Sequence, residues 1–438
     1  MPWRDALSPA QMKRIALLAP ADHSHDMLAA VGRSGVVELD LPYVPGSAPD
    51  ELDRVAQSGV NDHGTVGWVG WVPARELAGL TVGLAGLGAA VVPIAPPRGR
   101  QPPTLLGGRQ NNRVSRSLVD TYGTVPYADI DPSRLAGIAY VVMFGMMFGD
   151  VGHGAILLII GLLLRSGKIR RLQKLGRTWA FVAGAGLTSM FFGALYGEAF
   201  GPTGLIPVLW LNPLADPIPL LVAALVLGAV LLAGAYALGT VNRVREAGWG
   251  YALYASSGAA GSVLFLSLGL LVWGVLVEIP TMAVVAAVLA ATALTLIFIG
   301  FFVDAGGGAT GAMQASIEVV DAVIRLGSNV VSFARLAAFG LTHAALLTVV
   351  WTATVALWQP DARALAAVVV FIVGNVLTFG LEALVAGVQA LRLEYYELFS
   401  RIFDSEGRAF HPWVLEPTPE HDAVSSTDPG PISERHHL

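Results

Sequence analysis

The sequence predicts a mainly α-helical, multi-pass membrane protein with a small α/β (α+β) domain at its N-terminal end. Composition is the first reason: 54% of the 438 residues are hydrophobic, 13% are charged, and the mean hydropathy is +0.61. Ordinary soluble domains carry about 25% charged residues, so the deficit is too large for a soluble enzyme. Length is the second reason, because apolar stretches near the ~20 residues that cross a bilayer recur from 135 to 400.

The residue types and motifs that are missing exclude several classes of protein. The chain contains no cysteine, which excludes disulfides, thiolate metal sites and a cysteine nucleophile. Its net charge of −5 gives no overall basic character for binding nucleic acid. No phosphate-binding loop, metalloprotease motif or serine hydrolase motif occurs. We therefore expect a chain that is not an enzyme by itself and that uses no metal or cofactor.

Residues 1–130 are predicted to form a short cytoplasmic domain and a linker. The runs RIALLAP and AAVVPIAP indicate short strands that end at prolines, and SHDMLAAVGRSG and ARELAGLTVGLAGLG indicate short helices that stop at glycines. Such alternation is typical of an α/β or α+β domain. The N-terminus lacks the apolar core of a cleaved signal peptide, so we expect it to stay in the cytoplasm.

Residues 131–410 are predicted to form the membrane domain, with about eight transmembrane helices. These are expected near 135–150, 153–165, 179–199, 218–240, 252–276, 281–303, 312–357 and 364–400. The first two are short and rich in glycine, and the last two are long. A helix over the seventh stretch would extend roughly 69 Å at ~1.5 Å per residue, about twice the bilayer core, so it must tilt, break or project.

Loop charges predict the orientation in the membrane. The segment 165–177 carries six Lys or Arg and no acid, and 241–248 carries two arginines, so both are expected on the cytoplasmic side. Residues 201–217 and 277–280 carry neither Lys nor Arg. Alternation across the predicted spans then places both termini in the cytoplasm of a cell-membrane protein. The segment 411–438 is rich in Pro, Ser and acids, which predicts a disordered tail.

The seventh apolar stretch carries an unusual set of polar residues around Arg335. An arginine near the bilayer centre costs about 3 kcal/mol on insertion scales and ~10 or more in simulations of an isolated helix. At ~100° per residue, four further polar groups lie within about 80° of Arg335 on the helix surface: Asp321, Ser328, Ser332 and His343. Either this polar stripe serves an ion path, or Arg335 pairs with Asp321 or another buried acid and only fixes helix packing.

The last apolar stretch repeats this pattern. Glu382, Gln389 and Arg392 lie within about ten residues of one another, and Glu382 and Gln389 share one face. An acid, an amide and a base inside an apolar helix indicate an ion path. The alternatives are an internal pair of Glu382 with Arg392, or an Arg392 that extends its charged end to the membrane interface.

Glycines and neighbouring polar residues mark the earlier spans. Small residues four apart let membrane helices approach closely, so packing is the leading interpretation of four glycines: Gly145, Gly149, Gly193 and Gly197. Asp150, His153 and Glu198 lie beside these glycines near predicted span ends. They either line a water-filled vestibule or cap helices in the interface.

Four blocks of the sequence resemble one family of membrane proteins. They are MFGMMFGDVGHG, SMFFGALYGEAFG, SNVVSFARLAAFGLTHA and LEALVAGVQALRLEYYELFSRIFDSEGRAFHPW. In this order they are similar to blocks of subunit a, also called subunit I, the 116 kDa subunit family of V-type and A-type rotary ATPases. The likeness covers roughly residues 110–413. The pair of arginine-bearing helices is its most specific part.

The resemblance implies a stator subunit that couples proton or Na⁺ movement to the rotation of a ring of carboxylate-bearing proteolipid subunits. It implies that Arg335 is the essential arginine and Arg392 the supporting one. The residues expected in the two half-channels are Glu382, Gln389, His343, Asp321, Ser332 and Ser328. The implied partners are the proteolipid ring, the central-stalk cap, the peripheral-stalk subunits and the lipid bilayer, without nucleic acid.

The short soluble part of the chain departs from the pattern of this family. The soluble half has only about 130 residues and no heptad run for the long arm with which relatives reach the peripheral stalks. Either an unusual stator contact or a further protein is therefore expected to replace this arm. The main alternative function is a stand-alone secondary transporter or channel, which the lack of an internal repeat disfavours. A scaffold without translocation is disfavoured because Arg335, Arg392 and Glu382 are present.

Overall fold

The computed structural model describes residues 9–41, 51–97, 100–105, 119, 123–167, 176, 178–359, 363–403 and 407–415. These fall into two compact units, one made of 11–102 with the segment from 410 onward, the other of 1–10 with 103–409. Most of the basic segment 165–177 and residues 416–438 of the predicted tail lie outside the described residues.

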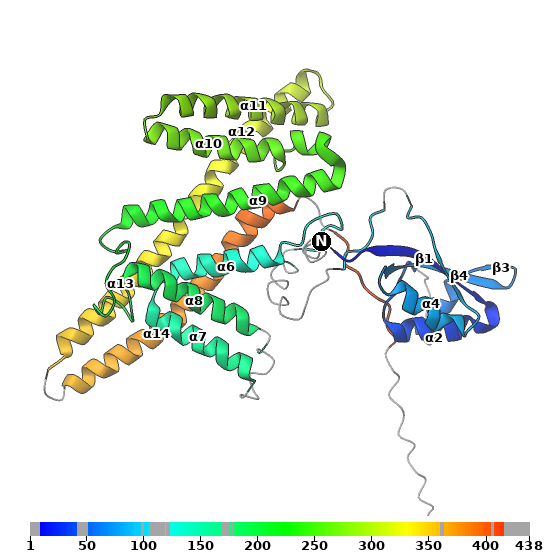
Figure 1. Cartoon of the computed structure of the whole chain (residues 1–438), viewed down its shortest axis with the longest axis horizontal. Helices are drawn as coiled ribbons and strands as arrows, with labels where there is room; N and C mark the ends of the chain where they lie inside the picture. Colours follow the sequence, from blue (N-terminus) through cyan, green and yellow to red (C-terminus); the bar gives the residue numbers. More distant parts are fainter. Residues whose placement is uncertain are drawn as a thin grey trace, which may run out of the picture. The chain divides into compact units, whose positions relative to one another are not determined.

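The smaller unit is an antiparallel sheet with short helices. Its strands are β1 (Met12–Pro20), β2 (Glu38–Leu39), β3 (Val60–Asp62), β4 (Thr65–Pro73) and β5 (Ala90–Pro93), in the order β2-β4-β1-β5 with β3 paired to β4 (Figure 1). Its helices are the 3₁₀ turn η1 (Ala21–His23), α2 (Ser24–Ser34), α3 (Glu51–Gln57) and α4 (Leu77–Ala85). The predicted small α+β domain is confirmed.

Alternating burial explains the sheet. Ile15, Leu17 and Ala19 of β1 are buried at every second position, as in a strand with one face on a core. β1 pairs along its whole length with β4. The sequence did not predict β4, because glycines interrupt its apolar run. One of these, Gly70, has no room for a side chain, since a Cβ there would lie 2.5 Å from the carbonyl oxygen of Glu38.

Residues 410–415 pack against the same small unit. Trp413 is buried in its core, and the Trp413 N–H donates to the carbonyl of Val37 at 2.8 Å. The N–H of His411 donates to the carboxylate of Glu38 at 2.8 Å. The segment predicted as a tail, 411–438, therefore begins with residues that belong to the packed domain.

The larger unit is a bundle of apolar helices (Figure 1). They are α6 (Ser133–Met147), α7 (Val151–Ser166), α8 (Trp179–Tyr196), α9 (Pro217–Tyr254), α10 (Ala259–Leu276), α11 (Pro280–Asp304), α12 (Gly308–Ser332), α13 (Ala334–Leu357), α14 (Arg363–Leu393), a π-helical turn η4 (Glu394–Phe399) and α15 (Ser400–Ile402). α7 packs on α8, α10 on α11, and α13 on α14, α9 and α6.

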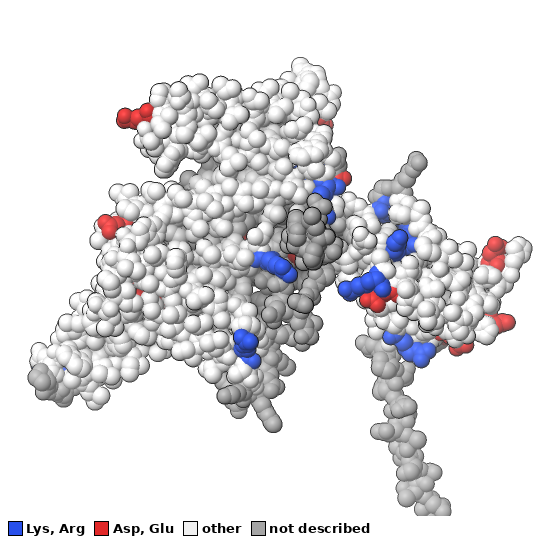
Figure 2. Space-filling model, in the orientation of Figure 1, with Lys and Arg blue, Asp and Glu red and all other residues white. Residues whose placement is uncertain are grey.

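Six helical stretches are long and apolar enough to cross a membrane. They are Trp179–Tyr196, Pro217–Glu246, Gly248–Leu276, Pro280–Asp304, Gly308–Leu357 and Arg363–Ile402. α6 and α7 are apolar but have only 15 and 16 residues, fewer than the ~20 that span a bilayer. Charged side chains are sparse on the face of this unit that Figure 2 shows. The chain is thus a multi-pass membrane protein, and the predicted count of eight spans is not confirmed.

The last two apolar stretches form helical runs of 50 and 40 residues, as their length predicted. The first of them is not one uninterrupted helix, because α12 ends at Ser332 and α13 begins at Ala334. At the join the Phe333 N–H donates to the carbonyl of Val330 at 3.1 Å, the three-residue spacing of a tighter turn. In Figure 1, α12 and α13 nevertheless follow one diagonal across the unit.

The four predicted packing glycines lie at crowded or strained positions. A Cβ on Gly145 or Gly149 would lie 2.6 Å from side-chain atoms of α8. Gly193 lies against the backbone at the start of α7 with no room for a Cβ. Gly197 ends α8 with a φ of 75°, a conformation that favours glycine. A larger residue at any of them would disturb the contact of α8 with its neighbours.

A buried polar cluster joins the end of α9 to the segment before α6. Arg243 is fully buried and donates to the Glu246 carboxylate at 2.7 Å. The Ile130 N–H donates to Asn242 Oδ1 at 3.1 Å, and the adjacent Asp129 is fully buried. Burial, and next the carboxylate of Glu246, raise the pKa of Asp129 to about 7.

Asp129→Asn should flatten the pH dependence of stability. The pKa of Asp129 rises from 3.8 to about 7 in the folded chain, so the stability that its bound proton contributes is complete below about pH 4 and is lost as pH rises to about 7. We expect the unfolding temperature of the wild type to fall between about pH 4 and about pH 7 and then to level off, and that of Asp129→Asn to fall less. Asp304→Asn, at an exposed carboxylate, serves as the control and should follow the wild type. Equal falls in both variants would contradict this prediction.

Candidate functional site

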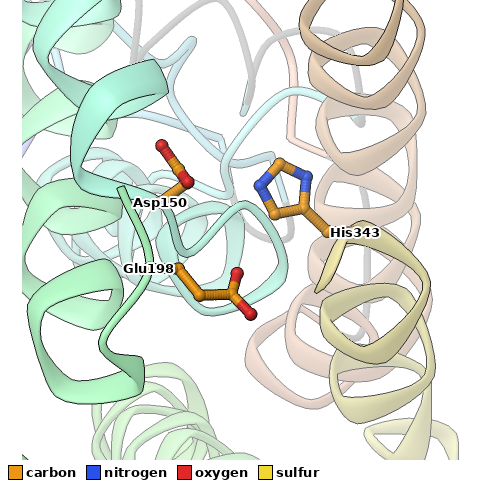
Figure 3. A group of neighbouring side chains, drawn as sticks. All are labelled: Asp150, Glu198 and His343. Atoms are coloured by element: carbon orange, nitrogen blue, oxygen red, sulfur yellow. The ribbon is translucent and has the colours of Figure 1, made fainter. Parts of the chain in front are cut away.

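Three side chains from distant parts of the sequence meet inside the helical unit. Asp150 precedes α7, Glu198 follows α8, and His343 lies in α13. Each offers one potential ligand atom, and these atoms all lie within 4.8 Å of one another. The three residues are 0%, 5% and 2% exposed, and their side chains converge in Figure 3. The structure therefore joins two of the predicted vestibule residues to one predicted half-channel residue.

Local backbone requirements position the two acids. Asp150 is the N-cap of α7: Oδ1 accepts from the His153 N–H at 2.8 Å, and Oδ2 accepts from the Gly201 N–H at 2.9 Å. The carbonyl of Glu198 accepts from the Val151 N–H at 2.9 Å. These bonds tie the start of α7 to the turn after α8. Asp150 thus caps a helix and also faces the cluster.

The histidine of the cluster is held by an acid on the next helix. His343 Nδ1 hydrogen-bonds to the Glu382 carboxylate of α14. An imidazole that donates from Nδ1 keeps a lone pair on Nε2. Nε2 of His343 has no hydrogen-bond partner among the described residues. Among the described residues Glu382 forms its salt bridge with His343 and none with Arg392, so the alternative pair of Glu382 with Arg392 is not formed.

A second histidine and aromatic rings enclose the cluster. His153 Nε2 lies 3.1 Å from Asn375 Oδ1, and the His153 and His343 rings are 5.6 Å apart. The ring of Phe148 lies 4.8 Å from that of His343, and the ring of Phe379 lies 5.5 Å from that of His153. Such apolar walls lower the local dielectric, which strengthens interactions between the polar groups inside.

The two predicted arginines are near each other. Arg335 of α13 is half-buried and Arg392 of α14 is exposed. The charges that act most strongly on Arg335 are those of Arg392 and Glu397. Neither arginine forms a salt bridge with any acid in the described ranges. Two like charges are therefore held together without an acid directly bound to either.

Asp321 does not neutralise Arg335. It forms a salt bridge with Arg325, one helical turn on, at 2.6 Å, and both side chains are more than half exposed. Ser328 is exposed, and its carbonyl accepts from Ser332 Oγ at 3.0 Å within the helix. The alternative in which Arg335 pairs with Asp321 is therefore not formed.

Polar groups lie on both sides of Arg335 along the helix. Asn329, with its amide oriented to suit its neighbours, donates to Glu397 Oε2 at 2.9 Å and accepts from Arg401 Nε at 3.0 Å. At ~1.5 Å per residue, Asn329 lies about 9 Å before Arg335 and His343 about 12 Å after it. The arginines thus separate two polar regions.

Asn375 is a member of the site that sequence reasoning missed. It is only 7% exposed and contacts His153. It stands seven residues before Glu382, which stands seven before Gln389, so all three share one face of α14. This spacing was the available signal. Gln389 Oε1 is buried and has no partner among the described residues, so this polar face continues toward Arg392.

Fold and site together define a class: a multi-pass membrane protein whose two longest helical runs hold arginines between two polar regions. The chain also matches the model of the V-type ATPase 116kDa subunit family over residues 61–206 and 311–415. These ranges cover more than half of the chain and contain every residue of the site. The chain therefore belongs to the V-type ATPase 116kDa subunit family.

Similar proteins come from archaea and bacteria. The chain is 27% identical over 354 residues to the A-type ATP synthase subunit I of Aeropyrum pernix, covering 68% of this chain and 49% of that protein. For the same subunit of Archaeoglobus fulgidus the identity is 27% over 397 residues, with 79% and 58% covered. It is 31% identical over 141 residues to V-type ATP synthase subunit I 2 of Treponema pallidum, with 30% and 31% covered. The chain spans about half the length of its archaeal relatives.

Proposed function

We propose that the chain is the ion-translocating stator subunit of the membrane sector of a V/A-type rotary ATPase. The observation that carries this proposal is the pair Arg335 and Arg392, which forms no salt bridge with an acid among the described residues and lies between two polar regions. A cation in an apolar setting needs a counter-charge. We infer that carboxylates of a rotating proteolipid ring supply it in turn.

Electrostatics explains why an arginine suits this position. A ring carboxyl in lipid stays protonated, because burial disfavours its charged form. Beside a fixed guanidinium its pKa falls by about 1–3 units, and it releases the proton. Arginine keeps its charge throughout, because its own pKa exceeds ~12. It thereby separates the site of proton release from the site of proton uptake.

The two polar regions then act as half-channels for protons or Na⁺. The first is formed by Asp150, His153, Glu198, His343, Asn375, Glu382 and Gln389. The second is formed by Asp321, Ser328, Ser332 and Asn329. An ion would enter through one region, bind to a ring carboxylate, move with the rotating ring, and leave through the other region, because Arg335 closes the direct route between them. Coupled flow thus requires rotation of the ring.

Partners and orientation follow from this role. We propose that both termini face the cytoplasm and that the small α+β unit contacts the central-stalk cap or the peripheral-stalk subunits. This unit is the described part of the chain outside the apolar helical bundle, which makes it the candidate for stator contacts. The whole complex sits in the cell membrane.

Cysteine cross-linking tests the proposed contact with the ring. The chain has no cysteine, so a single introduced thiol gives an unambiguous product. Ser332→Cys, close to Arg335, should form a disulfide with a cysteine placed next to the ring carboxylate in the assembled complex. Val284→Cys on α11, where Val284 is 63% exposed, serves as the matched control and should not cross-link. If neither position cross-links while the purified chain alone carries ions, the stand-alone transporter is the correct function.

A further inference from the structure

We propose that Asp150, Glu198 and His343 form a binding site for one divalent transition-metal ion, with Zn²⁺ as the best match. The geometry is the first argument. Their ligand atoms lie within 4.8 Å of one another, and the three side chains converge from α7, the turn after α8, and α13 (Figure 3). Tetrahedral zinc bonds of ~2.0–2.1 Å place the ligand atoms roughly 3.3 Å apart. Side-chain rotations that move each ligand atom by about an ångström would therefore complete the site.

Unused lone pairs are the second argument. His343 Nε2 and Glu198 Oε2 are both buried and have no hydrogen-bond partner among the described residues. Both residues are more than nine-tenths buried and face the cluster. A buried polar atom without a partner is destabilising. A bound cation would use both lone pairs at once.

The surrounding hydrogen bonds are arranged as they are around metal ligands. Glu382 holds His343 Nδ1, which leaves Nε2 for the metal, and metal-binding histidines usually donate their other N–H to a carboxylate in this way. Asp150 is oriented by the backbone N–H groups of His153 and Gly201. The ligands are therefore pre-oriented by neighbours that do not themselves contact the ion.

The donor set selects the ion. Imidazole nitrogen and carboxylate oxygen are both zinc ligands, and three protein ligands with water in a fourth position is the ligand number of catalytic zinc sites. Ca²⁺ and Mg²⁺ prefer six or more oxygen ligands, and soft thiolate sites need cysteine. The cluster also gathers the carboxylates of Asp150, Glu198 and Glu382, so a divalent cation would offset their negative charge. Sequence spacing predicted no metal site because the three ligands come from three separate helices or turns.

A further consequence rests on the proposed function. If ions pass through this cluster, Zn²⁺ bound there occupies the route and stops translocation. Binding and inhibition are separate measurements. Binding tests the metal site alone, whereas inhibition tests whether the ion route includes the cluster.

Metal titration of the purified full chain tests the site. After chelator treatment, we expect one Zn²⁺ per chain by elemental analysis, and Co²⁺ in its place should give the intense visible absorption of a tetrahedral N/O site. His343→Ala and Glu198→Gln should weaken Zn²⁺ binding at least 10-fold, and Glu382→Gln about 10-fold. Glu394→Gln, at another fully buried glutamate outside the cluster, is the matched control and should bind like the wild type.

The outcomes separate this inference from the proposed function. Absence of stoichiometric Zn²⁺, lack of a tetrahedral Co²⁺ spectrum in the wild type, or equal binding by His343→Ala would overturn the metal site. The wild-type Co²⁺ spectrum tests the metal site even if a variant does not fold. One bound Zn²⁺ with undiminished ion transport in the assembled complex would keep the metal site and remove the cluster from the proposed ion route.

Discussion

Arg335→Ala is expected to abolish ATP-driven ion uptake by the assembled complex while leaving the complex intact. Without the guanidinium, a passing carboxyl loses the ~1–3 unit lowering of its pKa and stays protonated. The barrier between the two polar regions is lost as well. Assembly should survive because Arg335 forms no salt bridge with a described acid and is only half-buried. The measurement is quenching of a pH-sensitive dye in proteoliposomes, where we expect at least about a 100-fold loss of initial rate.

Two companion variants sharpen this test. Arg335→Lys should restore only part of the rate, because a desolvated ammonium can lose its proton and lacks the planar fork of arginine. Arg363→Ala removes an arginine at the exposed start of α14 and should retain wild-type uptake. Normal ATP-driven uptake by Arg335→Ala in a complex of correct composition would refute the proposed mechanism.

The lengths of the apolar stretches predicted most of the helices, whereas features that depend on local packing were not predicted. Long apolar runs predicted α8 to α14, because bilayer thickness sets their length. A break in the seventh stretch was one of the expectations, but its position at Phe333 was not predictable, since its φ of −74° and ψ of −11° remain near helical values and no proline or glycine marks it. β4 was missed for the opposite reason: its glycines suggest a turn, but they allow close strand contact at Gly70.

The candidate site was only partly predictable, because its pairs lie across helices. Arg335 and Glu382 stand out in sequence as charges within apolar stretches. The bond between His343 and Glu382 depends on how α13 packs against α14, which no residue spacing reveals. By contrast, the bond of Asp321 to Arg325 is a simple pair four residues apart that the sequence already contained. An acid and a base four residues apart on one helix are therefore more readily paired than charges that lie further apart in the sequence.

Asp150→Ala is expected to destabilise the chain by about 2–4 kcal/mol. Loss of an N-cap costs ~0.5–2 kcal/mol. The N–H of Gly201, a buried residue, would also lose its acceptor, at about 1–3 kcal/mol for an unsatisfied buried group. The start of α7 would then separate from the turn that carries Glu198. Thermal unfolding in detergent, followed by circular dichroism, measures the effect.

Asp150→Asn separates the capping role of this residue from a role in ion movement. Asparagine is as good an N-cap as aspartate, so the bond to the His153 N–H can be kept, whereas its NH₂ group cannot accept from the Gly201 N–H. We therefore expect only part of the stability to return. An amide cannot take up a proton, so transport should remain low if Asp150 belongs to the half-channel. Wild-type transport by Asp150→Asn would show that this residue is only a helix cap. An unfolding temperature as low as that of Asp150→Ala would show that the stability depends mainly on the hydrogen bond from the Gly201 N–H to Asp150 Oδ2.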